Sequence, residues 1–114
     1  MSENRTHIVH DRRNGHPFRT LGYRITGSNR GMVEVVAAET RCHPNDNFDR
    51  ETGRKHVHSR LEAYQNGGRS SDLRAFEASV SMDVPTNNRE YRELEQTLLE
   101  LSDIRLPTPA ALKD

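Results

Sequence analysis

The chain has 114 residues, of which 32% are hydrophobic and 30% are charged, and its formal net charge is zero. This length fits one domain and excludes two, and the low apolar content predicts a thin core with many polar loops. One cysteine excludes an intrachain disulfide, and the sequence contains neither a long apolar run nor the apolar segment of a signal peptide. We therefore expect a cytoplasmic protein that does not enter a membrane.

Charge is unevenly distributed along the chain. Residues 1–60 carry 11 Lys and Arg against 7 Asp and Glu, which gives +4, whereas residues 61–114 carry 6 against 10, which gives −4. Such a chain can offer a basic face to nucleic acid or to an acidic protein surface. Alternatively, the acidic half neutralises the basic half within the fold or across a homodimer.

The first half of the chain predicts a β-hairpin. Residues 1–17 are polar and are expected to be either flexible or a short edge strand. Residues 18–25 alternate between apolar and polar side chains and residues 32–42 are rich in β-branched ones, so we expect two antiparallel strands. Residues 27–31, with glycine at both ends, have the chemistry of the connecting turn.

A basic helix is expected to follow, with Asn47 as its N-cap. At about 100° per residue, its inward face carries Gly53, Val57, Leu61 and Tyr64. Because glycine within a helix costs about 1 kcal/mol relative to alanine, Gly53 needs a packing reason. We expect the helix to lie so close to a sheet that no Cβ fits there.

The outward side of this helix supplies the candidate binding residues. Arg54, Lys55 and His58 fall on one outward flank, and Arg60 borders the apolar stripe on the other side. We assign these four residues to partner binding. The competing interpretation is a solvated helix surface, because a half-buried helix ordinarily has a charged outer face.

The second half of the chain predicts a third strand and a second helix. Residues 66–71 have the composition of a mobile loop, and residues 72–84 alternate cleanly between apolar and polar side chains. A cap at Asn87 followed by a leucine stripe predicts a helix that ends near Asp103. Residues 105–114 contain two prolines and are expected to form a flexible tail.

These elements define one α+β domain over residues 18–104. The order β-β-α-β-α predicts a two-layer sandwich, an antiparallel sheet of three or four strands with both helices on one face. The other face, with Arg24 and Glu77 among its residues, is then open to water or to a partner.

Metal binding and catalysis find little support. Cys42, His43, Asp46, His56 and His58 lie within seventeen residues. However, adjacent residues on an extended chain point in different directions, and two helical residues two apart are separated by about 200°. We expect no metal, no cofactor and no catalytic residue. A small metal-dependent enzyme built on Cys42 and the histidines is the least favoured alternative.

Nucleic-acid binding is the stronger alternative. Such binding normally comes with a basic isoelectric point and aromatic platforms for stacking, whereas here the isoelectric point is about 7.0. The cations available to it in the sequence are Arg12, Arg13, Arg19, Arg24, Arg41, Arg54, Lys55 and Arg60.

Part of the chain resembles a known group of sequences. In small uncharacterised accessory proteins of tailed phages and prophages, a strand ending in Cys leads through Pro and Asp to a Phe-Asp-Arg segment and then to Gly-Arg and a later Arg on a helix. Residues 33–61 are similar to this pattern, although Val57 replaces the small residue usual four positions after the glycine. The matching positions are Cys42, Pro44, Asp46, Phe48, Asp49, Arg50, Gly53, Arg54 and Arg60.

The resemblance implies a phage accessory protein and supplies no activity. Together with the lack of a catalytic pattern, it leads us to expect a non-enzymatic binding protein, such as an inhibitor or adaptor, in the host cytoplasm. We expect it to contact a host protein through the basic helix, and homodimerisation is an option because a small sheet leaves edges that need cover.

Overall fold

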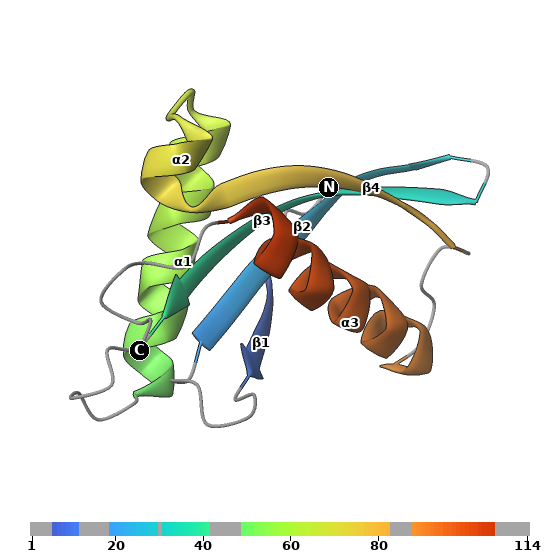
Figure 1. Ribbon diagram of the computed structural model, residues 1–114, viewed down its shortest axis with the longest axis horizontal. Coiled ribbons are helices and arrows are strands. Elements are labelled where there is room, and N and C mark those ends of the chain that lie inside the picture. Colours follow the sequence, from blue (N-terminus) through green and yellow to red (C-terminus); the bar gives the residue numbers. More distant parts are fainter. Residues whose placement is uncertain (1–5, 12–18, 30, 42–48, 83–87, 107–114) are drawn as a thin grey trace.

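A four-stranded antiparallel sheet in the order β1-β2-β3-β4 forms the centre of the computed structural model (Figure 1). The structure describes residues 6–11, 19–29, 31–41, 49–82 and 88–106. Its elements are β1 (His7–Asp11), β2 (Arg19–Asn29), β3 (Met32–Arg41), α1 (Arg50–Gln65), α2 (Ser70–Leu73), β4 (Ala75–Ser81) and α3 (Asn88–Arg105). The α+β class, the antiparallel sheet and the order of the main elements are confirmed.

The predicted hairpin is present with a tighter turn. β2 continues to Asn29, and only two residues separate it from Met32. A shift in pairing register between Ile25 and Gly27 lets the strands continue past the expected turn. Gly31 adopts a positive φ of 81°, which suits glycine at the turn itself.

The N-cap of α1 is Asp49, two residues after the expected cap at Asn47. Asp49 is the N-cap, and its side chain accepts hydrogen bonds from the Glu51 N–H at 3.1 Å and the Thr52 hydroxyl at 2.7 Å. These two bonds, to residues two and three positions after Asp49, make Asp49 the N-cap. Asn47 lies outside the described residues.

Gly53 has the packing role that the sequence predicted. A Cβ at Gly53 would lie 3.1 Å from Cβ of Thr20 on β2 and still closer to the Thr20 hydroxyl oxygen. Gly22 is equally close to α1, since a Cβ there would lie 2.9 Å from a methyl group of Val57. The glycines therefore let α1 lie directly on β2.

The prediction that both helices lie on one face of the sheet is wrong. Leu21 and Tyr23 of β2 belong to the core that contains Leu94 and Leu98 of α3, whereas the alternate residue Gly22 meets α1. The strands therefore separate the two long helices, as Figure 1 shows, and the arrangement has three layers. The reason is that β3 is apolar on both faces, so each face needs its own cover.

The remaining differences lie at element boundaries. Within residues 1–17, the edge-strand alternative holds for His7–Asp11. The short helix α2 occupies part of the expected loop at 66–71, so β4 starts at Ala75 instead of 72. Leu106 is buried and its N–H bonds to the carbonyl of Ser102, so the packed domain extends past residue 104. Asn87, Val84 and residues 107–114 lie outside the described residues.

Candidate functional site

The buried face of α1 determines where its charged side chains lie. Gly53, Val57 and Leu61 pack against the sheet, so Arg54 and Lys55 are exposed while His58 and Arg60 are half-buried. With the buried stripe as the centre, Arg54 and His58 lie on one flank of the helix and Arg60 lies on the other. Lys55 points away from the sheet. The four predicted binding residues therefore do not form one surface.

Hydrogen bonds show which strand each flank faces. Arg60 donates through Nη1 to the backbone carbonyl of Glu39 at 2.8 Å, so its flank faces β3. On the other flank, Gln65 accepts from Arg24 of β2 at 2.7 Å. Arg54 and His58 therefore lie on the side of α1 that faces β2 and β1.

A row of basic residues runs along this second flank. Arg50, Arg54 and His58, spaced four residues apart, form what we call the basic row. His10 of β1 lies beside it, because the His10 ring nitrogen Nδ1 is 3.1 Å from the Thr20 hydroxyl that Gly53 also meets. Burial, followed by the positive charges of Arg50 and Arg54, lowers the pKa of His10 below its ordinary value.

The exposed cations of α1 contrast with the other arginines. Within the described part of the chain, no ion pair joins Arg50, Arg54 or Lys55 to a carboxylate. Arg60 differs, because it is turned inward, and burial and then the charge of Arg74 lower its pKa. Its guanidinium is engaged with the protein itself.

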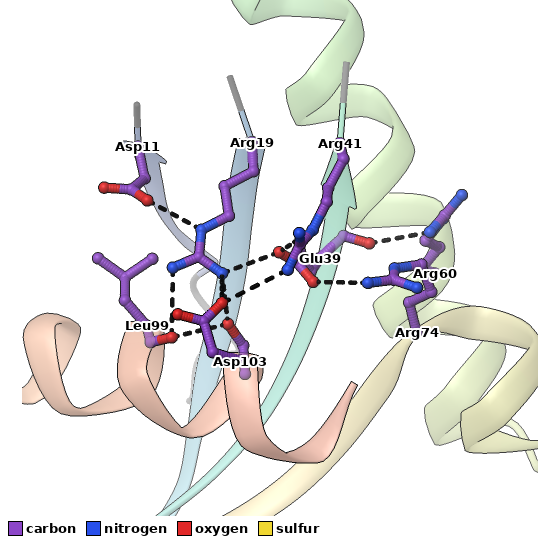
Figure 2. A network of polar contacts seen from close by, with 9 residues as sticks. Asp11, Arg19, Glu39, Arg41, Arg60, Arg74, Leu99 and Asp103 are labelled. Atoms are coloured by element: carbon purple, nitrogen blue, oxygen red, sulfur yellow. Dashed lines mark hydrogen bonds and ion pairs between the residues drawn. The ribbon is translucent and has the colours of Figure 1, made fainter. Parts of the chain in front are cut away.

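Three of the other arginines, Arg19, Arg41 and Arg74, belong to a buried ion cluster (Figure 2). The carboxylate of Glu39 is fully buried and is bound by Arg19 at 3.0 Å, Arg41 at 2.9 Å and Arg74 at 3.1 Å. With all three guanidinium groups in contact, the negative charge of the buried Glu39 carboxylate is compensated inside the fold.

Arg19 connects this cluster to the neighbouring strand β1 and to the helix α3. It pairs with Asp11 of β1 at 2.9 Å and with Asp103 of α3 at 2.7 Å, and it donates to the Ser102 hydroxyl at 2.8 Å. Although burial opposes its charge, the bonds to Asp11 and Glu39 raise the pKa of Arg19 above its ordinary value. The cluster therefore joins β1, β2, β3 and α3, and within it Asp103, from the acidic second half of the chain, pairs with Arg19 and Arg41 of the basic first half.

Sequence reasoning missed this cluster although a signal was present. Glu39 follows Val35 and Ala37 at two-residue spacing, so all three point to the same face of β3. A glutamate in phase with core residues needs a buried cation, and the cations available were treated as surface charges. The proposed nucleic-acid surface loses Arg19 and Arg41, which bind Glu39, and Arg24, which binds Gln65. Two other candidates, Arg12 and Arg13, lie outside the described residues.

The face of the sheet beyond α1 contains a shallow pocket of about 460 Å³. Tyr64 of α1 and Glu77 of β4 line it together with Val36, and the Tyr64 hydroxyl lies 3.3 Å from the Glu77 carboxylate. Burial, and then the charge of Glu77, raises the pKa of Tyr64 above its ordinary value. The prediction of an open face opposite both helices is wrong, because each face of the sheet is covered by one long helix. Glu77 lies on the same face as α1, and Arg24 lies beneath α1, where it is buried.

Metal ligands do not come together in the described residues. Within residues 6–11, 19–29, 31–41, 49–82 and 88–106, no three His, Cys, Asp or Glu side chains are placed to hold an ion. His56 and His58 lie on opposite flanks of α1. Cys42, His43 and Asp46 lie outside the described residues.

Comparisons with known proteins return no match: no family model, curated protein or solved structure is similar to this chain. Among the described helices, none has the length and apolar character needed to cross a membrane.

Proposed function

We propose that this protein is a non-enzymatic accessory protein, phage-encoded and acting in the host cytoplasm, that binds an acidic surface of a host protein through α1. The observation that supports it is the division among the basic residues. Arg19, Arg24, Arg41 and Arg74 have carboxylate or amide partners inside the fold, whereas Arg50, Arg54 and Lys55 are exposed without a described ion-pair partner.

Unpaired exposed cations suit a partner contact for an electrostatic reason. A set of like charges on one helix raises the local potential, which steers an acidic partner and increases the association rate. Because α3, the more acidic helix, lies on the opposite face of the sheet, it does not neutralise these charges. The proposed contact residues are Arg54, Lys55 and His58; Arg60 stays in the proposal only as the residue that anchors α1 to β3.

The phage setting rests only on the resemblance of residues 33–61 to the residue pattern that the sequence analysis describes for phage accessory proteins. A small inhibitor or adaptor of a host assembly is the role that this setting and the charge pattern favour together. Such a protein needs a charged surface that attracts the partner and a rigid element that carries it. The exposed cations of α1 provide the charge, and the close contacts at Gly53 and Gly22 hold α1 against β2.

Nucleic-acid binding by the same face is the second candidate. The exposed Arg50, Arg54 and Lys55 favour it, but Tyr23 and Phe76 are buried and Tyr64 is half-buried, so the aromatic residues whose burial is described offer little surface for stacking. Phosphate contacts give a steep dependence of affinity on salt, so titration of DNA and RNA binding against salt separates the two candidates. Absence of binding at low salt excludes this candidate.

The direct test is capture of a partner from host lysate, with and without nuclease treatment, by three forms of the full chain. The first is the natural sequence, the second carries Arg54→Glu and Lys55→Glu, and the third carries Arg69→Glu and Arg92→Glu. The third is a matched control, because Arg69 and Arg92 are exposed elsewhere and their reversal changes net charge equally.

We expect capture by the natural chain and the control and loss of capture by the α1 variant, with unchanged circular dichroism in all three. Retention of the partner by the α1 variant would count against the proposal. Loss of the partner from every form after nuclease treatment would instead assign the face to nucleic acid.

A further inference from the structure

The pocket beside Tyr64 lies at the point where α1 ends above the sheet. α1 ends at Gln65, which bonds to Arg24 of β2, but β2 continues to Asn29 and so projects past the helix (Figure 1). The hollow at this step has a volume of about 460 Å³, within the range of about 300–1,000 Å³ that is usual for small-molecule sites. Its lining residues come from three strands, from α1 and from the turn after α1: Thr26, Val36, Tyr64, Gln65, Gly68 and Glu77.

The polar groups that line this pocket use their own protons inside the protein. The Tyr64 hydroxyl donates to the Glu77 carboxylate at 3.3 Å, and the Thr26 hydroxyl donates to the backbone carbonyl of Glu34 at 3.2 Å. The backbone N–H of Gly68 donates to a carbonyl of α1 at 2.9 Å. An oxygen that donates its proton within the protein presents its lone pairs to a ligand. The pocket therefore offers mainly hydrogen-bond acceptors.

The charge at this pocket is negative. The Glu77 carboxylate is exposed, and in the described part of the chain no ion pair joins it to a Lys, Arg or His side chain. Arg24 lies beneath α1, where it bonds to Gln65 and has the Glu62 carboxylate 3.8 Å away. Arg105 donates to the backbone carbonyl of Glu77 and not to its carboxylate. The last turn of α1 contains no basic residue, so the negative end of the helix dipole adds to the charge of Glu77.

We propose that this pocket binds a small organic cation, a guanidinium group on an apolar stem of a few carbons. A planar guanidinium donates two parallel hydrogen bonds to a carboxylate, which suits the acceptors that Glu77 and Tyr64 present together. The stem contacts Val36, a buried apolar residue among those that line the pocket. This inference goes beyond the proposed function, because the site uses none of the exposed cations of α1.

The probe is n-butylguanidinium, titrated at low salt into the full chain labelled with nitrogen-15 while backbone resonances are recorded. The control ligand is n-butylurea, which has the same shape without the charge. A capped Gly-Arg-Gly peptide carries the guanidinium group as a side chain. Tighter binding of this peptide than of butylguanidinium supports the site with an arginine of a peptide as its ligand, and the reverse order supports it with a free small molecule as its ligand.

We expect butylguanidinium to shift the resonances of Tyr64, Gln65 and Glu77. Loss of a hydrogen bond between charged groups predicts at least about tenfold weaker binding for butylurea, and also for butylguanidinium with the Glu77→Gln chain, whose circular dichroism should be unchanged. Tyr64→Phe removes a neutral hydrogen-bonding group, so it should weaken binding by about two- to tenfold. The matched control is Glu93→Gln, which removes an exposed carboxylate of α3 and should bind like the natural chain.

Several results would overturn the inference. Equal affinity for butylurea shows that the pocket does not select a charge, and equal affinity of the Glu77→Gln chain shows that this carboxylate does not hold the cation. Absence of binding by either guanidinium probe, or shifts confined to other residues, also excludes the site. The chain with Arg54→Glu and Lys55→Glu separates this inference from the proposed function, because it should lose partner capture and still bind butylguanidinium. If the natural chain captures a partner but binds no guanidinium probe, only the pocket inference fails.

Discussion

Replacement of Glu39 by Gln tests whether the buried ion cluster holds the fold together. In Glu39→Gln, three guanidinium groups that lie 2.9–3.1 Å from the carboxylate lose the negative charge that they share, and Arg19 and Arg41 keep only Asp11 and Asp103 as carboxylate partners. Removing one partner of a buried ion pair costs about 3–5 kcal/mol, because the remaining charge is desolvated and uncompensated. A domain of this length has a total stability of roughly 6–15 kcal/mol, so the variant is expected to lose a large fraction of it.

A double-mutant cycle with Arg41→Met makes this prediction quantitative. Arg41 bonds Glu39 at 2.9 Å and reaches Asp103 only at 3.5 Å, so its loss is expected to reduce stability in the natural chain. In a chain that already carries Glu39→Gln, the same change relieves repulsion among the guanidinium groups, and it should be neutral or stabilising. The expected coupling is about 1.5 kcal/mol or more, since both residues belong to one network.

Urea denaturation at pH 7, followed by circular dichroism, measures all four corners of the cycle. Glu77→Gln is the control, because Glu77 is an exposed β4 residue, and surface changes are usually within about 0.5 kcal/mol. If Glu39→Gln costs no more than this control, or the two substitutions are additive, the cluster does not stabilise the fold as we infer.

Three further predictions concern α1 and α3. Gly53→Ala should destabilise the protein by about 1–3 kcal/mol despite better helix propensity, and Thr20→Ala in the same chain should recover part of this loss in thermal unfolding. Burial raises the pKa of Glu95, so Glu95→Gln should raise the melting temperature at pH 7; this advantage should shrink as the pH falls through the raised pKa, where the natural side chain becomes protonated. Arg54→Glu should raise the pKa of His10 in an NMR titration, because it removes a positive charge from the basic row; an unchanged value would place Arg54 elsewhere.

The local pattern of the sequence was sufficient to predict the main helices and strands and one close contact between α1 and the sheet. Alternation identified β2, β3 and β4, the leucine stripe identified α3, and Gly53 correctly indicated that α1 lies against the sheet. These features depend on neighbours within a few residues and on the shape of one side chain. The element boundaries differ from the predicted ones at the Asp49 cap of α1, at the register shift in β2 and at α2 before β4. Each of these features depends on specific hydrogen bonds.

Only the tertiary structure decided which charges are free. In the sequence Arg19, Arg41, Arg54 and Lys55 are equivalent cations, but Arg19 and Arg41 meet Glu39 and Asp103, which lie 20 or more residues from Arg19, whereas Arg54 and Lys55 point to solvent. The same holds for the layering: β3 shows apolar residues on both faces, but only the packed structure shows that α3 covers one face and α1 the other. Long-range pairing depends on how distant segments meet in space, and no local pattern contains that information.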